Sequence, residues 1–112
     1  MIKTVNIKKD FPNTDYAMFL IDQEIKYCRA VGCKALIIIH GYGSHGQGGA
    51  IKESVKQYLP ELKKKKIIKD FVFGENWGDA NSSKVNMCQI CPELILNENL
   101  QGLNSGVSVV LI

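Results

Sequence analysis

Hydrophobic and polar residues partly alternate over residues 2–8, and this period of two predicts a half-buried strand. Over residues 17–31 the apolar side chains are instead spaced by three or four positions, which is typical of one face of a helix. Gly32 then follows as a natural helix end. The uninterrupted apolar run at 35–39 predicts a strand that is buried on both faces. Strand, helix and strand in this order predict a βαβ unit with a parallel strand pair.

A second helical pattern begins at Ile51 and is followed by a third strand. The helix is expected to end near Leu59, because Pro60 has no amide proton and clashes with the preceding turn. A run of four lysines at 63–66 comes next, and residues 67–73 predict a strand. The simplest explanation of the lysine run is a solvated helix end, where cations complement the helix dipole.

The last part of the chain predicts a short helix and a terminal strand. Residues 82–91 have helical spacing, and residues 107–112 are apolar apart from Ser108, so this strand must be paired and covered. No repeat, linker or low-complexity segment interrupts the sequence, and residues 1–112 are expected to form a single domain. The residues predicted to share the buried face of the short helix are Val85, Cys88 and Cys91.

The composition is that of an ordinary globular protein with a mild positive charge. The net charge is +3, and Arg29 is the only arginine, so the positive charge is almost all lysine. This surplus suits a phosphate-rich partner without requiring one. No stretch is long and apolar enough to span a bilayer, and lysines interrupt the N-terminus where an export signal would lie. We therefore expect a cytoplasmic protein with no membrane partner.

The four cysteines allow two interpretations. Cys88 and Cys91 have the spacing of zinc ligands, and Cys28 with Cys33 would complete a set of four. Alternatively, all four are small buried hydrophobic residues, as reduced cysteines often are. We favour burial and assign no metal ligand, because the spacing of Cys28 and Cys33 is not that of a usual zinc knuckle.

The segment 40–49 is the part of the chain whose composition requires a functional explanation. The apolar strand ends abruptly in His40, five glycines follow, and a helical pattern then begins. Glycines let the backbone adopt positive φ and let a ligand come close. The unpaired amides at a helix N-terminus favour anions. The order of strand, glycine loop and helix therefore predicts an anion site.

Residues 41–46 also match the G-x-G-x-x-G pattern of dinucleotide-binding proteins. The chain is too short for a complete doubly wound fold with a substrate domain, and a histidine at the strand end is not part of the usual fingerprint. No G-K-[ST] follows, which excludes a Walker phosphate loop, and no serine hydrolase motif is present. A small phosphorylated ligand or nucleotide remains an alternative, as does a noncatalytic interaction module.

His40 itself has two interpretations. It can be a neutral histidine that fixes the loop by hydrogen bonds, or a general acid/base or phosphate contact that titrates near neutrality. Its place at the end of an apolar central strand favours a site, because ligands gather there in α/β sheets. His45, the other histidine of the chain, is expected to be a surface residue of the loop.

The order of these features resembles the Smr domain, the small MutS-related domain. Residues 38–44 (Ile-Ile-His-Gly-Tyr-Gly-Ser) are similar to the H-G-x-G motif that follows a central strand in that family. The helix that begins at 50–52 and the closing glycine turn and strand at 102–111 are similar as well. The resemblance implies an α/β fold (an α+β sandwich) of βαβαββ-like order, with two main helices packed on a four-stranded mixed sheet.

The resemblance also implies a function in nucleic-acid binding. Members bind DNA or RNA, often branched, and several are nicking endonucleases. His40 would then be the catalytic acid/base or a phosphate contact. No cofactor is assigned, and a divalent metal remains open, since no clear carboxylate cluster accompanies His40. The residues expected to hold nucleic acid or phosphate are Lys8, Lys9, Gly41, Gly43, Ser44 and Lys52, with added nonspecific attraction from residues 63–66.

The first strand departs from the family pattern. The family has an L-D-x-H-G or L-D-x-R motif there, but Asn6 stands in the place of the acid and Lys8 in the place of the histidine or arginine. Lys8 keeps a positive charge that can hold a phosphate. A lysine is a poor proton shuttle unless its pKa is depressed, so the departure favours binding over cleavage.

Overall fold

The computed structural model describes residues 1–9, 13–42 and 46–112. Within these residues, three α-helices surround one four-stranded sheet. In chain order the elements are β1 (Ile2–Asn6), α1 (Thr14–Val31), β2 (Ala35–Ile39), α2 (Gly46–Lys64), β3 (Asp70–Phe73), the 3-10 turn η1 (Gly74–Asn76), α3 (Ser82–Ile90), the 3-10 turns η2 (Pro92–Leu94) and η3 (Glu98–Leu100), and β4 (Val107–Leu111).

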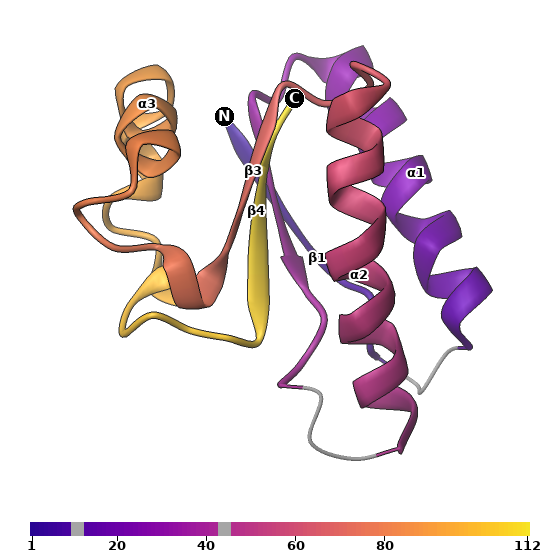
Figure 1. Ribbon diagram of the computed structural model, residues 1–112. Helices are drawn as coiled ribbons and strands as arrows, with labels where there is room; N and C mark the ends of the chain where they lie inside the picture. The colour runs from indigo at the N-terminus through magenta and orange to yellow at the C-terminus, as the bar shows by residue number, and fades with distance from the viewer. Residues whose placement is uncertain (10–12, 43–45) are drawn as a thin grey trace.

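The sheet is mixed and has the strand order β1-β2-β4-β3. β1 runs parallel to β2, and β4 runs antiparallel to both β2 and β3. β1, β2 and β3 therefore point in the same direction, and their carboxyl ends lie at one edge of the sheet together with the start of β4 (Figure 1). The predicted βαβ unit is confirmed, with the apolar strand β2 inside the sheet.

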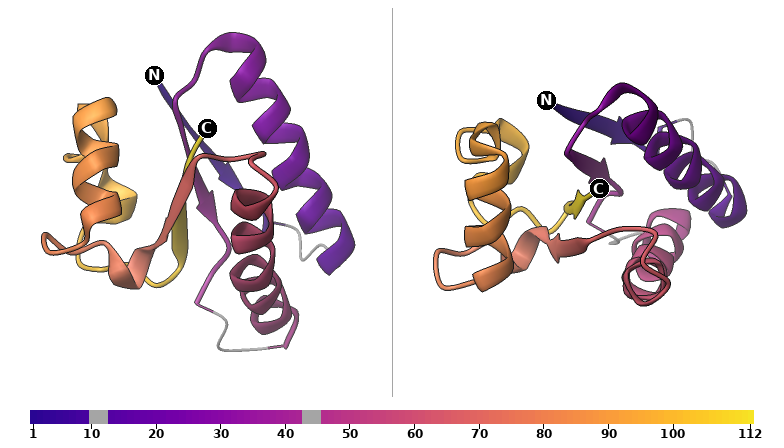
Figure 2. Two further views of the ribbon diagram at one scale, coloured as in Figure 1. Left: turned by 45° about the horizontal axis from the view of Figure 1, so that its top comes forward. Right: turned by 90° about the horizontal axis from the view of Figure 1, so that it is seen from above.

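Helices cover both faces of the sheet. α1 and α2 lie side by side on one face, and α3 lies on the other (Figures 1 and 2). Successive residues of β2 alternate between the two cores: Leu36 and Ile38 pack with α1 and α2, whereas Ala35 and Ile37 pack on the side of α3. The expected arrangement of two main helices on a four-stranded mixed sheet is confirmed, and α3 adds a layer on the second face.

α1 ends where the sequence predicts. Gly32 adopts a φ of 80°, and its amide donates to the Cys28 carbonyl as a helix cap. The Tyr58 hydroxyl of α2 donates to Asp22 of α1 over 2.5 Å, which joins the two helices. Among the described residues, no helix combines the length and hydrophobicity that crossing a membrane requires.

α2 continues past Pro60, so the expectation that it ends near Leu59 is wrong. The helix runs to Lys64 with the proline inside it. Pro60 is exposed, whereas Leu59 and Leu62 on either side of it are buried. Burying a leucine side chain stabilises a fold by about 1.5–3 kcal/mol. The two leucines therefore offset the cost of about 3 kcal/mol that an internal proline imposes.

Two strands are shorter than the sequence predicts. β1 ends at Asn6 instead of residue 8, and β3 begins at Asp70 instead of residue 67. The cause at β3 is a turn: Lys66 adopts a φ of 61°, and the Ile67 amide donates back into the last turn of α2. Regular pairing with β4 starts only after the chain has left this turn.

The buried face of α3 also differs from the predicted one. Met87 and Cys91 are buried, Cys88 is half-buried, and Val85 is 46% exposed. The predicted set is spaced by steps of three, and each such step rotates the helix surface by about 60°. The Val85 side chain therefore faces solvent. Met87 and Cys91 are four residues apart, so their side chains lie on the same side of the helix and both face the core.

Candidate functional site

The carboxyl ends of β1 and β2 bring Lys8, Lys9, His40 and Gly41 to one end of the sheet. We call this surface the loop edge, and it lies at the end of the sheet where α2 begins (Figure 1). Ligands gather at such edges in α/β folds, because loops and helix N-termini converge there. The loop edge comprises Ile7–Lys9 after β1, His40–Tyr42 after β2, Gly74–Glu75 after β3, Asn104–Gly106 before β4 and the first turns of α2.

His40 is buried at the loop edge and hydrogen-bonded at both ring nitrogens. Its side chain is 1% exposed. Nδ1 lies 2.8 Å from the Gly41 carbonyl oxygen, and Nε2 lies 2.9 Å from Ser108 Oγ. A carbonyl only accepts, so these partners assign the proton to Nδ1, and the Ser108 hydroxyl donates to Nε2. The ring thus links the end of β2 to Ser108, the second residue of β4.

The surroundings favour the neutral form of His40. Burial lowers its pKa below the ordinary value of 6.5, and the positive charge of Lys52 acts in the same direction. The hydrogen bond to Gly41 and the negative charge of Glu75 oppose this shift without cancelling it. A neutral ring with two internal partners has the contacts of a loop-fixing histidine. To touch a phosphate, the ring would have to give up one of these hydrogen bonds.

Gly41 is held by the turn before β4. The amides of His40 and Gly41 both donate to the Gly106 carbonyl oxygen over 3.0 Å, so the Gly41 amide is already engaged. Gly41 has a φ of +83°, and a Cβ built on it would lie 3.0 Å from Cδ of Lys8. The positive φ favours glycine at this position, and the Lys8 side chain packs directly over it.

The segment after β1 presents its lysines beside Gly41. The Lys8 amide donates to Oδ1 of Asn6 over 3.0 Å, and the Ile7 amide donates to the Ile39 carbonyl. Asn6 thus fixes the turn that lays the Lys8 side chain over Gly41. Lys8 and Lys9 are both exposed. The structure thus places the Lys8 side chain beside Gly41.

Lys52 instead faces a carboxylate. Its Nζ lies 3.5 Å from Oε2 of Glu75, and Nζ of Lys56 lies 3.2 Å from the same oxygen. The other oxygen, Oε1, is buried and has no hydrogen-bond partner in the described residues. Burial alone would raise the pKa of Glu75, but its backbone hydrogen bond and the two lysines outweigh this effect and lower it. At neutral pH, Lys52 and Lys56 are thus partly neutralised by a charged Glu75.

Two groups of predicted residues are not among those that the structure places at the loop edge. Gly43 and Ser44, together with His45, are outside the described residues. The lysine run 63–66 lies at the opposite end of α2 from the loop edge, about 27 Å away by the rise of the helix. Lys63 is paired there with Asp70 over 3.0 Å. The structure therefore does not bring the lysine run to the predicted site.

The four cysteines lie in two separate cores. Cys28 and Cys33 belong to the core beneath α1 and α2, whereas Cys88 and Cys91 belong to the core of α3 on the other face. One zinc ion cannot bind all four, so the four-cysteine zinc alternative is wrong. Burial raises the pKa of the Cys28 thiol to about 11, with Cys33 adding to the shift. Within the described residues, no group of three or more histidine, cysteine or acidic side chains is placed to hold a metal.

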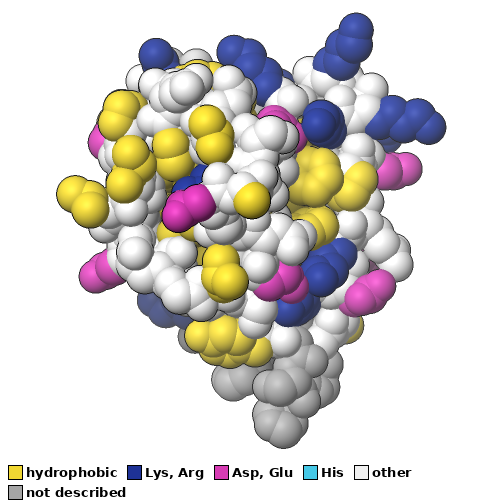
Figure 3. Space-filling model, turned by 60° about the vertical axis from the view of Figure 1, so that its left-hand side comes forward, with side chains coloured by type: hydrophobic (Ala, Val, Ile, Leu, Met, Phe, Trp, Pro, Cys, Tyr) yellow, Lys and Arg dark blue, Asp and Glu magenta, His cyan; other side chains and the backbone are white. Residues whose placement is uncertain are grey.

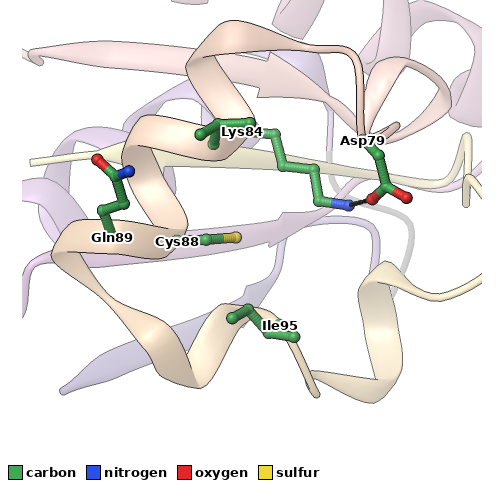
Figure 4. A pocket seen from close by; sticks show the side chains of 6 residues that line it. Asp79, Lys84, Cys88, Gln89 and Ile95 are labelled. Atoms are coloured by element: carbon green, nitrogen blue, oxygen red, sulfur yellow. Dashed lines mark hydrogen bonds and ion pairs between the residues drawn. The ribbon is translucent and has the colours of Figure 1, made fainter.

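A shallow pocket, separate from the loop-edge residues, lies on the face of the molecule that carries α3. Figure 3 shows hydrophobic side chains spread over this face. The pocket has a volume of about 350 Å³, and the ion pair of Lys84 with Asp79, 2.8 Å long, lies beside it (Figure 4). Its lining residues are Asp79, Lys84, Val85, Cys88, Gln89 and Ile95.

Comparison with known proteins agrees with this architecture. The Smr domain model matches residues 12–81, more than half of the chain, and the chain therefore belongs to the Smr domain family. Among solved structures, the Smr domain of Thermus thermophilus MutS2 is similar in fold, with a TM-score of 0.57. The match covers 97% of this chain and 95% of that chain at 20% sequence identity. A search of curated protein sequences found no match.

Sequence reasoning missed two residues that shape the surroundings of His40, namely Ser108 of β4 and Glu75 of the loop edge. Ser108 is a fully buried polar residue in an otherwise apolar strand, and that anomaly was the available signal, because buried hydroxyls need a partner. Glu75 follows β3, which is parallel in direction to β2. Because β2 and β3 run in the same direction, residues that follow their carboxyl ends lie at the same end of the sheet. Glu75 could therefore have been placed near His40 if the strand order had been known.

Proposed function

We propose that this Smr domain binds the sugar–phosphate backbone of DNA or RNA at the loop edge. The observation that carries the proposal is the Lys8 side chain lying across Gly41, where the carboxyl ends of β1 and β2 meet. An exposed lysine beside a glycine turn provides both charge and close approach for a phosphate. Lys9 adds charge next to it, and we extend the same role to Gly43 and Ser44 from the sequence motif.

His40 is proposed to act here as the anchor of the loop. Its two hydrogen bonds, to Gly41 and Ser108, support this role. They connect the turn at Gly41, beside which the Lys8 side chain lies, to the central strand β4. Nicking would require His40 to move a proton, and a buried neutral ring with two internal partners is not arranged for that step. The function supported best is therefore binding without an assigned cleavage step.

The binding proposal is tested by a salt titration. Fluorescence anisotropy with labelled DNA and RNA should give an affinity that falls steeply with salt, because each neutralised phosphate releases counterions. Lys8→Gln and Lys9→Gln should each reduce the slope of log K against log salt by about one. Lys65→Gln, an exposed lysine beyond the far end of α2, is the matched control and should leave the slope unchanged.

Several outcomes would overturn the proposal. Absent or salt-insensitive binding would do so, and so would equal losses in the loop-edge variants and the Lys65 control. Stabilisation by a free nucleotide but not by a polynucleotide would favour the small-ligand alternative, because a ligand stabilises the state that it binds. Cleavage is assayed separately on supercoiled plasmid and structured RNA, with magnesium or with a chelator. Products formed by the wild type and lost in His40→Ala would add a cleavage step to the binding function.

A further inference from the structure

We propose that Tyr42 is a stacking platform for an unpaired base, so that the loop edge selects DNA or RNA with single-stranded segments. The inference rests on the proposed backbone binding and adds a specificity-determining residue to it. It starts from the position of Tyr42, which directly follows Gly41 and is 65% exposed.

Tyr42 differs from the other exposed aromatic residues of the described chain. Tyr16 and Phe19 stack on each other with ring centroids 6.0 Å apart. Tyr27 is covered by Lys3, whose Nζ lies 4.1 Å from the ring centroid. Tyr42 is more exposed than these three, and among the described residues no ring or cation covers it in this way. A large apolar ring left open beside a cationic turn is a suitable surface for a flat ligand.

The ring is also held in place. A Cβ built on Gly106 would lie 3.3 Å from Cε1 and Cζ of Tyr42, so the ring rests against the backbone of that glycine. Gly106 is fixed in turn, because its carbonyl accepts the amides of His40 and Gly41 and its amide donates to Asn104. Binding therefore requires little additional ordering of the Tyr42 side chain.

Tyr42 and Lys8 meet at the same glycine. Lys8 crosses Gly41, and Tyr42 is the next residue along the chain. This arrangement offers a cation to a backbone phosphate and a ring to a neighbouring base. In a duplex, the faces of the bases are already stacked on one another, so only an unpaired base can use the ring. The pairing of charge and ring therefore predicts a preference for single-stranded, forked or looped nucleic acid.

The test compares a labelled single strand, the same strand with abasic sites, and a duplex of equal length, all by fluorescence anisotropy. The abasic strand keeps its phosphates and loses the bases that could stack. Wild-type protein should bind the base-containing strand about 5- to 150-fold more tightly than the abasic one, the range expected for one stacked base. Tyr42→Ala and Tyr42→Leu should lose this difference, whereas Tyr42→Phe should keep it. Affinity for the abasic strand and the duplex should stay nearly constant.

Tyr27→Ala serves as the matched control, because it removes another exposed tyrosine and should keep the wild-type preference. Circular dichroism verifies that each variant is folded, and the leucine variant retains an apolar side chain without an aromatic face. If the alanine and leucine variants keep the wild-type preference for bases, stacking on Tyr42 is refuted while backbone binding stands. If the wild type binds all three probes equally, base recognition is refuted in the same way. If it binds none of them, the proposed function and this inference both fail.

Discussion

The neutral, buried state of His40 makes the stability of the fold depend on pH in a specific direction. The unfolded chain binds a proton with a pKa near 6.5, whereas burial lowers the pKa of His40 in the folded chain. Below that pH the unfolded state therefore holds more protons, and folding stability must fall as the pH falls. The stability is fully present above about pH 6.5 and is lost progressively down to the folded pKa.

The size of this loss of folding stability follows from the uptake of one proton by His40 in the unfolded state. A group that is protonated only in the unfolded state changes stability by about 1.4 kcal/mol per pH unit. The loss at pH 5 therefore approaches about 2 kcal/mol if the folded ring stays neutral to that pH. Nearly complete burial acts toward this limit and the hydrogen bond to Gly41 acts against it, so about 2 kcal/mol is the upper bound for the loss at pH 5.

The assay is urea unfolding followed by the fluorescence of Trp77, which is the only tryptophan and is buried. It is carried out in a His45→Gln background, which leaves His40 as the only histidine of the chain. His40→Asn in the same background provides the reference, since Asn does not titrate. The difference between the two proteins should shrink as the pH is lowered from about 7 to about 5. A constant difference, or a folded pKa above 6.5 measured by NMR for His40, would refute the reasoning.

Three further predictions concern the loop edge and the hydrophobic core between the sheet and α3. A Cβ at Gly74 would lie 1.8 Å from a carbonyl oxygen of the turn before β4, so Gly74→Ala should destabilise by about 1–3 kcal/mol or more in urea unfolding. Gly78→Ala, with nothing within 4 Å of the added carbon, is its control and should change little. Met87→Ala should cost about 2–5 kcal/mol by the same measurement, whereas Val85→Ala should cost under about 1 kcal/mol; equal effects would contradict the assigned face of α3. Glu75→Gln should free its two lysine partners and steepen the salt dependence of DNA binding by up to about two charges, and an unchanged slope in the anisotropy titration would count against the loop edge as the binding surface.

The sheet and its two main helices could be predicted from the sequence because their signals are local. The apolar run of β2 and the glycine after α1 each determine their own element, whatever surrounds them. The end of α2 could not be predicted, because the local penalty of Pro60 competes with the burial of Leu62, and only the packed structure decides between them. The first residue of β3 could not be predicted for the same reason, because the turn at Lys66 depends on hydrogen bonds back to α2.

The site shows the same division between local and non-local information. The motif residues His40 and Gly41 are contiguous, and their place after a buried strand was sufficient to indicate a site. Their partners Ser108 and Gly106 lie more than sixty residues away along the chain and meet them only through the pairing of β2 with β4. Neither partner could be assigned from spacing, because the strand order had to be known first.

The contacts of Asn6 and His40 explain why binding, and not proton transfer, is the function best supported at this site. Both residues stand at positions where the family resemblance implies acid–base groups, and both use a side-chain polar atom in a hydrogen bond within the chain. The Asn6 side chain accepts a hydrogen bond from the Lys8 amide, and His40 Nδ1 donates a hydrogen bond to the Gly41 carbonyl oxygen. These two contacts fix the segments that bring Lys8 and Gly41 together. The residues at these two positions therefore hold a cationic turn in shape, and this turn is where we propose that a phosphate backbone binds.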